Sequence, residues 1–244
     1  DRSLLRETLA RLGGLQHLSS PLVVCGDEQR FITADHLQDQ DDAILLVEAS
    51  RCNTGPAATA AAIVARERDE DAIILLLPSD HLIRNLEAFS HAVAKAEIAA
   101  AAGMIAMFGI TPEGPSPLYG YIERGEAEEG TYRVASFVEK PDSERAAGLL
   151  ETGRYYWNSG MFMCRADVLI SEMTRFKPEI VACAESAVAG MREDLAFQRL
   201  GPWGDCPSEP IDKAIMESTD KAVVIPGEFG WSDVGSWSTM HAVF

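Results

Sequence analysis

This chain of 244 residues has few cysteines, no long apolar run and no signal-peptide pattern at its start. Its 5 cysteines form no Cys-x-x-Cys pair and are odd in number, which favours reduced thiols over a disulfide framework. The longest apolar run covers only residues 98–110, whereas a membrane-spanning helix needs about 20 residues. The N-terminus, Asp-Arg-Ser, carries charges throughout. We therefore expect a soluble, cytoplasmic protein.

Basic residues are also scarce. The 21 lysines and arginines are outnumbered by 38 aspartates and glutamates, so the net charge is −17 and the isoelectric point is about 4.6. Such an acidic surface repels the nucleic-acid backbone and anionic lipid, which excludes both as natural partners. An anionic substrate would therefore need a cation or a local basic cluster to offset this field.

Several catalytic and phosphate-binding motifs are absent. The sequence contains no His-Glu-x-x-His, Gly-x-Ser-x-Gly, Gly-x-Gly-x-x-Gly or Walker loop, and no cysteine has a motif-level catalytic context. The 5 histidines show no metal-ligand spacing. We interpret them as ordinary surface or helix residues.

The apolar residues that are present, 47% of the chain, alternate between two patterns up to residue 110. Runs of strand length lie at 22–25, 43–47, 72–77 and 104–108, and amphipathic stretches of helix length lie at 4–12, 28–37, 56–68 and 86–101. Continuous apolar runs favour strands buried on both faces, and Pro56 suits the first position of a helix. We predict a doubly wound α/β layer with right-handed crossovers.

The pattern changes after residue 110. A turn-rich loop at 111–117 precedes a predicted hairpin formed by 118–124 and 131–138. Helices are predicted at 142–151, 165–175, 177–190 and about 209–219, and a strand at 222–225. We interpret this half as an elaboration of the same core, so that residues 1–244 form a single domain.

Two aspartates are candidate metal ligands. Asp80 follows a buried strand, where open α/β sheets bind ligands, and its carboxylate could hold a divalent cation. Asp233 lies among glycines and tryptophans and could be a second ligand. Each could instead be a helix N-cap, the helix after Asp233 beginning at Ser236.

Two further segments place polar groups beside apolar ones. Glu139 can accept hydrogen bonds from sugar hydroxyls, and Lys140 can offer a charge to a phosphate; the alternative is an exposed ion pair on an edge strand. In the run 155–162, Asn158 suits vicinal hydroxyls and Gly160 permits close backbone approach by a ligand. The alternative there is a hydrophobic turn packed on the core.

Seven segments in series resemble the nucleotide-sugar pyrophosphorylase family, in particular the branch that transfers GMP to mannose 1-phosphate. They are Asn53 to Ala57, Leu77 to His81, Tyr119 to Ile122, Phe137 to Pro141, Trp157 to Phe162, Ile211 to Glu217, and Gly230 to Trp237. The resemblance implies a three-layer α/β/α, Rossmann-like nucleotidyltransferase core with a mixed, mainly parallel sheet. Residues 1–110 would be its nucleotide-binding half and residues 111–244 its sugar-phosphate-binding half.

The resemblance also implies substrates and roles. GTP and mannose 1-phosphate would give GDP-mannose and pyrophosphate, with Mg²⁺ held by Asp80 and Asp233. Lys140 would bind the sugar phosphate and Glu139 a mannose hydroxyl. Gly120 and Asn158 would line the mannose pocket. The residues near the guanine would be Asn53, Thr54 and Pro56.

The sequence differs from the family pattern at both ends and at single positions within the motifs. The glycine-rich loop that precedes the first helix in the family and its C-terminal extension are absent from residues 1–244, so no isomerase activity is assigned. Cys52 stands where we expect arginine, and Gly55 where we expect alanine. A pyrophosphorylase for another sugar or base, and a catalytically silent homologue that binds nucleotide sugar, stay open as alternatives, as does a homodimer.

Overall fold

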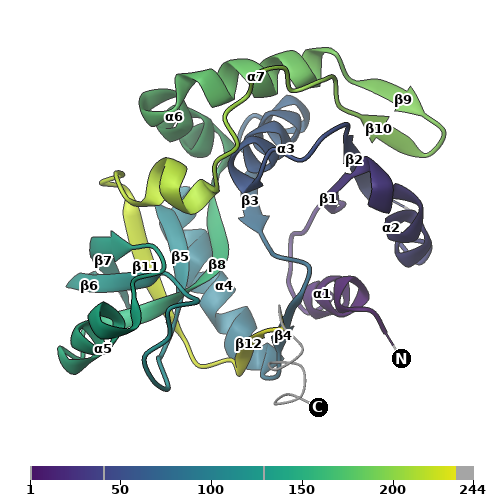
Figure 1. Ribbon diagram of the computed structural model, residues 1–244. Helices are drawn as coiled ribbons and strands as arrows, with labels where there is room; N and C mark the ends of the chain where they lie inside the picture. Colours follow the sequence, from purple (N-terminus) through teal and green to yellow (C-terminus); the bar gives the residue numbers. More distant parts are fainter. Residues whose placement is uncertain (1, 41, 129, 235–244) are drawn as a thin grey trace. The chain divides into compact units, whose positions relative to one another are not determined.

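The computed structural model describes residues 2–40, 42–128 and 130–234 (Figure 1). Its contacts divide the chain into two compact units. The first unit takes in residues 16–72 and 166–215, and the second takes in 2–15, 73–165 and the chain from Met216. Each unit therefore contains segments from both the N-terminal and the C-terminal half of the chain, and the single domain stays a prediction.

The sheet of the first unit has four strands in the order β1-β2-β10-β9. They are β1 (Leu22–Gly26), β2 (Ile44–Glu48), β9 (Arg192–Asp194) and β10 (Phe197–Arg199). β2 pairs in parallel with both β1 and β10, whereas β9 and β10 form an antiparallel hairpin that the sequence did not predict. All residues of β2 are buried, as its apolar run predicts for a central parallel strand.

The helical elements of the first unit are η1 (Asp27–Gln29), α2 (Arg30–His36), α3 (Thr54–Arg68), α6 (Ala166–Phe176) and α7 (Pro178–Ala189). α3 packs against both α6 and α7, which lie beside it in Figure 1. Its alanines permit this close packing, and Ala60 and Ala62 are fully buried. The helix predicted at 209–219 is only a short π-helical turn, η2 (Asp212–Met216). Pro207 and Pro210 disfavour helical backbone in the residues before them, so the helix cannot begin earlier.

The sheet of the second unit has six strands in the order β3-β8-β5-β11-β7-β6. They are β3 (Ile73–Leu76), β5 (Ile105–Ile110), β6 (Tyr121–Glu128), β7 (Thr131–Val138), β8 (Tyr155–Arg165) and β11 (Ala222–Gly227). Among its described pairings, only that of β5 with β11 is parallel. The mixed α/β class is therefore confirmed, but the expectation of a mainly parallel sheet is wrong for this unit.

The difference arises from β8. The alternative of a hydrophobic turn at 155–162 is wrong, because this run belongs to an 11-residue strand that pairs antiparallel with β3, β5 and β6. Gly160 has a φ of 70°, and the register between β5 and β8 shifts around it. A left-handed glycine inside a strand marks a bulge, and in the sequence it looks like a turn.

A separate two-stranded sheet pairs β4 (His81–Ile83) with β12 (Trp231–Asp233). The helices of this unit are α1 (Leu4–Leu12), α4 (Leu86–Ala101) and α5 (Ser143–Glu151). α1 and α4 have the predicted bounds, because Ser3 and Asn85 cap their first turns with side-chain hydrogen bonds. α4 packs on β5, β8 and β11. Within the three described stretches, no helix combines the length and the apolarity needed to cross a membrane.

The central position of β5 predicts the effect of one substitution. A Cβ atom at Gly109 would lie 2.6 Å from Val224 Cγ2 and 2.9 Å from Tyr156 Cβ, on the strands to either side. Gly109→Ala should therefore lower the free energy of unfolding by about 1–3 kcal/mol. Gly114→Ala is the matched control, because its Cβ would meet no atom within 4 Å, and it should change stability by less than about 0.5 kcal/mol. Urea denaturation measures both, and equal midpoints for the two variants would contradict the packing described here.

Candidate active site

Two aspartates that are far apart in the sequence lie on neighbouring backbone segments at the small sheet of the second unit. Asp80 directly precedes β4, and Asp233 ends β12. The antiparallel register sets Asp233 opposite His81, the neighbour of Asp80; Cα atoms of opposed residues lie about 4.5–5.5 Å apart in such a pair. No helix begins at Asp80, so its interpretation as an N-cap is wrong, and Asn85 caps the next helix instead. The helix considered after Ser236 lies outside the described residues.

His81, which follows Asp80 and lies opposite Asp233, is buried. Its interpretation as an ordinary surface or helix residue is therefore wrong. The indole N–H of Trp231 donates to His81 Nδ1 over 3.1 Å. Burial lowers the pKa of His81 below its ordinary value, while the charges of Asp80 and Asp233 oppose that shift. The imidazole is therefore held with Nδ1 unprotonated, as an acceptor.

Helix α1 holds the backbone on both sides of Asp80. Thr8 Oγ1 donates to the Ser79 carbonyl over 3.4 Å, and the guanidinium of Arg11 donates to the His81 carbonyl. Arg11 also donates to Thr8 Oγ1 over 3.0 Å, so the two helix residues form one network. The exposed carboxylate of Asp80 therefore projects from a backbone that is fixed at both neighbouring residues.

Three predicted sugar-pocket residues meet in the same unit. The N–H of Asn158 on β8 donates to the Gly120 carbonyl over 2.7 Å. A Cβ atom at Gly120 would lie 2.7 Å from Glu139 Oε2 and 3.3 Å from Asn158 Cβ. A side chain at position 120 would therefore collide with Glu139, and the three residues pack closely together.

The ion pair between Glu139 and Lys140 is present, with Nζ and Oε1 3.0 Å apart. The alternative of an exposed ion pair on an edge strand holds for one partner only, because the Glu139 side chain is 11% exposed. Both residues follow the end of β7, where the strand pairs with β6. The Lys140 side chain is 62% exposed and its φ is 43°, so this residue carries its ammonium out of the strand direction toward solvent.

Aromatic rings in contact connect the segment of Asp233 with that of Gly120. The ring of Tyr119, the neighbour of Gly120, lies 4.9 Å from that of Trp157 and 5.3 Å from that of Trp231. Burial and the charge of Asp233 raise the pKa of Tyr119, so its hydroxyl lies within the electrostatic reach of Asp233. Sequence patterns did not identify this connection, because its members come from three separate segments.

The donor set at Asp80 and Asp233 fits one kind of metal ion. In residues 2–40, 42–128 and 130–234, no group of three or more His, Cys, Asp or Glu side chains is arranged to hold a metal alone. Mg²⁺ commonly binds one or two carboxylates and takes its other ligands from water and substrate phosphates. Two carboxylates on neighbouring segments therefore fit a hard divalent cation such as Mg²⁺ or Mn²⁺ that completes its coordination with water or with substrate phosphates, and do not fit a closed structural site.

The predicted nucleotide residues lie in the first unit, at the start of α3. Asn53 has a φ of 70° and caps the helix, its side-chain oxygen accepting the Thr54 N–H over 2.9 Å. Thr54 Oγ1 accepts the Ile211 N–H over 3.0 Å. The helix begins at Thr54, so Pro56 is its third residue and not its first; it is buried, and the N–H it lacks would have had no intrahelical partner there. Asn53 and Thr54 are exposed.

The sequence did not single out Glu48, which ends β2 in the first unit. Its side chain is buried, faces the indole of Trp203, and has Oε1 without a hydrogen-bond partner among the described residues. Burial raises the pKa of this carboxyl above its ordinary value, and Arg51 opposes the shift. A carboxylate at the end of a buried apolar run was the signal that could have identified it, as it did for Asp80.

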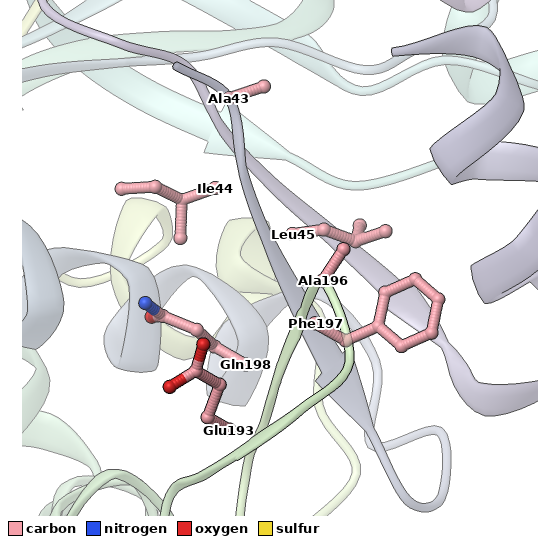
Figure 2. A pocket seen from close by; sticks show the side chains of 7 residues that line it. All are labelled: Ala43, Ile44, Leu45, Glu193, Ala196, Phe197 and Gln198. Carbon is pink, nitrogen blue, oxygen red and sulfur yellow. The ribbon is translucent and has the colours of Figure 1, made fainter. Parts of the chain in front are cut away.

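None of these residues lines the pocket found in the first unit. Ala43, Ile44, Leu45, Glu193, Ala196, Phe197 and Gln198 line it, between β2 and the β9–β10 hairpin (Figure 2). It contains no predicted site residue, and its few polar groups do not form a basic cluster that would attract a phosphate.

The whole chain matches a known family and several characterised proteins. Residues 1–244 match the family described as nucleotidyl transferase. A mannose-1-phosphate guanylyltransferase of Salmonella typhimurium is 44% identical over 255 residues, which cover 100% of this chain and 53% of that protein. The chain thus spans about half the length of the curated relatives it matches.

Two solved structures resemble the chain closely. That of mannose-1-phosphate geranyltransferase from Thermus thermophilus has a TM-score of 0.86 and 29% identity, covering 99% of this chain and 69% of that one. That of mannose-6-phosphate isomerase from Helicobacter pylori has a TM-score of 0.85 and 27% identity, covering 95% and 91%. The predicted nucleotidyltransferase fold is confirmed.

The buried carboxyl of Glu48 predicts a pH-dependent stability difference. The pKa of this carboxyl is 4.5 in an unfolded chain and higher in the folded chain. The folded chain therefore binds the proton more tightly. The free energy of unfolding should therefore fall as the pH rises from 4.5 through the folded pKa. Glutamine does not titrate, so the free energy of unfolding of Glu48→Gln, minus that of the natural chain, should be larger at pH 7.5 than at pH 4. Urea denaturation at both pH values measures this, and an identical difference at the two would contradict it.

Proposed function

The chain belongs to the nucleotidyl transferase family, and we propose that it transfers GMP from GTP to mannose 1-phosphate, releasing pyrophosphate and forming GDP-mannose. The observation that carries this proposal is that one unit contains both Asp80 and Asp233, on neighbouring segments, and also Gly120 packed closely against Glu139, whose carboxylate pairs with Lys140. The choice of reaction is supported by the relatives named mannose-1-phosphate guanylyltransferase, at 41–44% identity. We expect this reaction to take place in the cytoplasm, and a homodimer stays a prediction.

The acidic chain needs a cation at this site. Both reacting phosphates are anionic, and the net charge of −17 increases their repulsion from the protein. Bound between Asp80 and Asp233, Mg²⁺ would neutralise phosphate charge and polarise the α-phosphate. Asp80 and Asp233 would fix its position, since the backbone on either side of Asp80 is tied to α1.

The sugar phosphate would be held by the second unit. Glu139 can accept hydrogen bonds from mannose hydroxyls, and its half of the ion pair sets the direction of Lys140. Lys140 would then bind the phosphate as a point charge. Gly120 and Asn158 would border the sugar ring, and the lack of a side chain at Gly120 lets the Glu139 carboxylate lie close to this backbone.

The base would be recognised by the first unit. Asn53 and Thr54 are exposed at the start of α3, beside buried Pro56. Glu48 lies near Cys52 in the same segment and has an oxygen without a partner. A carboxylate can accept both N–H donors on one edge of guanine, a pair that adenine and the pyrimidines lack. This supports GTP as the nucleotide.

No side chain is needed as a general base. The attacking oxygen of mannose 1-phosphate is already ionised, so no proton has to be removed before attack. The residues would act by positioning the two substrates in line and by stabilising charge in the transition state.

The proposed function is tested by measuring pyrophosphate release from GTP and mannose 1-phosphate by the protein at its full natural length. We expect release that requires Mg²⁺ and is lost in Asp80→Asn and Asp233→Asn. Binding of GDP-mannose without any release would contradict the proposal and favour the silent homologue. Faster release with another sugar phosphate or nucleoside triphosphate would favour the other alternative.

Substitution of Lys140 should affect the KM for one substrate more than the KM for the other. Lys140→Ala should raise the KM for mannose 1-phosphate by roughly tenfold to a hundredfold, because a charge-assisted hydrogen bond contributes about 1.5–3 kcal/mol. The KM for GTP should change much less. Lys95→Ala removes the same charge from the exposed face of α4 and is the matched control. Equal losses for both substrates in steady-state kinetics would show that Lys140 has a structural role.

A further inference from the structure

The hydrogen bond between Trp231 and His81 joins the two strands that carry the carboxylates. Trp231 begins β12, and Asp233 ends it two residues later. Side chains two residues apart in a strand lie on the same face, and directly opposed residues share that face as well. Trp231, Asp233 and His81 therefore lie on one face of the β4–β12 pair. The indole of Trp231 reaches diagonally across it to His81 Nδ1, 3.1 Å away.

This contact is also held by packing. The rings of His81 and Trp231 are 5.3 Å apart and nearly perpendicular, at 85°. Tyr119 packs edge-on against Trp231 with ring centroids 5.3 Å apart, and the guanidinium of Arg11 donates to the carbonyl of His81. His81 is 6% exposed, so water cannot readily replace the indole as its hydrogen-bond partner.

The strand pair itself is short. β4 and β12 each have three residues, and their sheet contains no further strand among those described. Backbone hydrogen bonds from the Arg84 and Asn85 N–H groups to the Phe229 and Gly230 carbonyls extend the pairing at the end away from Asp233. At the end that carries Asp233, such short strands leave their relative position weakly defined. Side-chain contacts between the strands must therefore contribute to the separation of Asp80 and Asp233.

We propose that Trp231 and His81 are positioning residues that hold Asp233 against Asp80 at the separation needed for a divalent cation. This inference rests on the proposed function for its metal ion. It assigns neither residue as a ligand: His81 Nδ1 is already occupied by the indole N–H. Their contribution is to reduce the freedom of β12, so that both carboxylates are present when the cation arrives.

The test is the affinity of the full-length protein for Mn²⁺ alone, measured from the signal of free Mn²⁺ in electron paramagnetic resonance. Trp231→Phe keeps an aromatic ring against Tyr119 but removes the N–H, and we expect it to weaken Mn²⁺ binding about tenfold. Trp157→Phe is the matched control. Its ring also stacks on Tyr119, but its indole N–H has no hydrogen-bond partner among the described residues, so the Mn²⁺ affinity should not change.

Substitutions of His81 test whether Trp231 affects the Mn²⁺ affinity through its hydrogen bond to His81. His81→Leu removes the acceptor and should weaken Mn²⁺ binding as much as Trp231→Phe does. The double variant should be no weaker than either single one, because both remove the same bond. His81→Asn keeps an acceptor near the position of Nδ1 and should recover most of the affinity. Thermal unfolding of each variant, followed by circular dichroism, checks that the fold is retained.

Each outcome is decisive. Mn²⁺ affinity in Trp231→Phe equal to that of the natural protein would overturn the inference, as would additive losses in the double variant or no Mn²⁺ binding by the natural protein. If the natural protein binds Mn²⁺ and the variants behave as expected, but no pyrophosphate is released from GTP and mannose 1-phosphate, the proposed function fails and the positioning role stands.

Discussion

The pairing of β4 with β12 is the constraint on which the rest of the candidate site depends. It joins residues 81–83 with residues 231–233 and sets the backbone of Asp233 beside that of Asp80 and His81, in a chain that is strongly acidic. Hydrogen bonds from α1 hold the backbone on either side of Asp80, and the indole of Trp231 joins β12 to His81.

The same constraint extends to the segment of Gly120. Tyr119 packs edge-on against Trp231 and directly precedes Gly120, so β12 and this segment are connected through two rings. Gly160, inside β8, approaches Pro78 and His81, which brings the segment of Asn158 toward the carboxylates. Catalysis by positioning requires this rigidity, because no single side chain performs proton transfer in the proposed reaction.

The sequence predicted the elements whose position depends on neighbouring residues in the chain. The bounds of α1 and α4 follow from capping residues and apolar periodicity, and β2 follows from its apolar run. The elements that were missed depend on distant partners: β8 is a strand because β3, β5 and β6 flank it, and β4 is one because β12 lies beside it. The motifs identified Asp80, Glu139 and Asn158, whereas the burial of His81 and of Glu48 depends on segments that no local pattern connects to them.

The most direct measurement is a crystal structure of the full-length protein with GDP-mannose and Mn²⁺, in which anomalous scattering locates the metal. We predict one Mn²⁺ bound to a carboxylate oxygen of Asp80, a carboxylate oxygen of Asp233 and phosphate oxygens of the nucleotide sugar, with Lys140 on the phosphate next to mannose. Mn²⁺ bound elsewhere, or the two aspartates separated with β12 displaced from β4, would contradict the account.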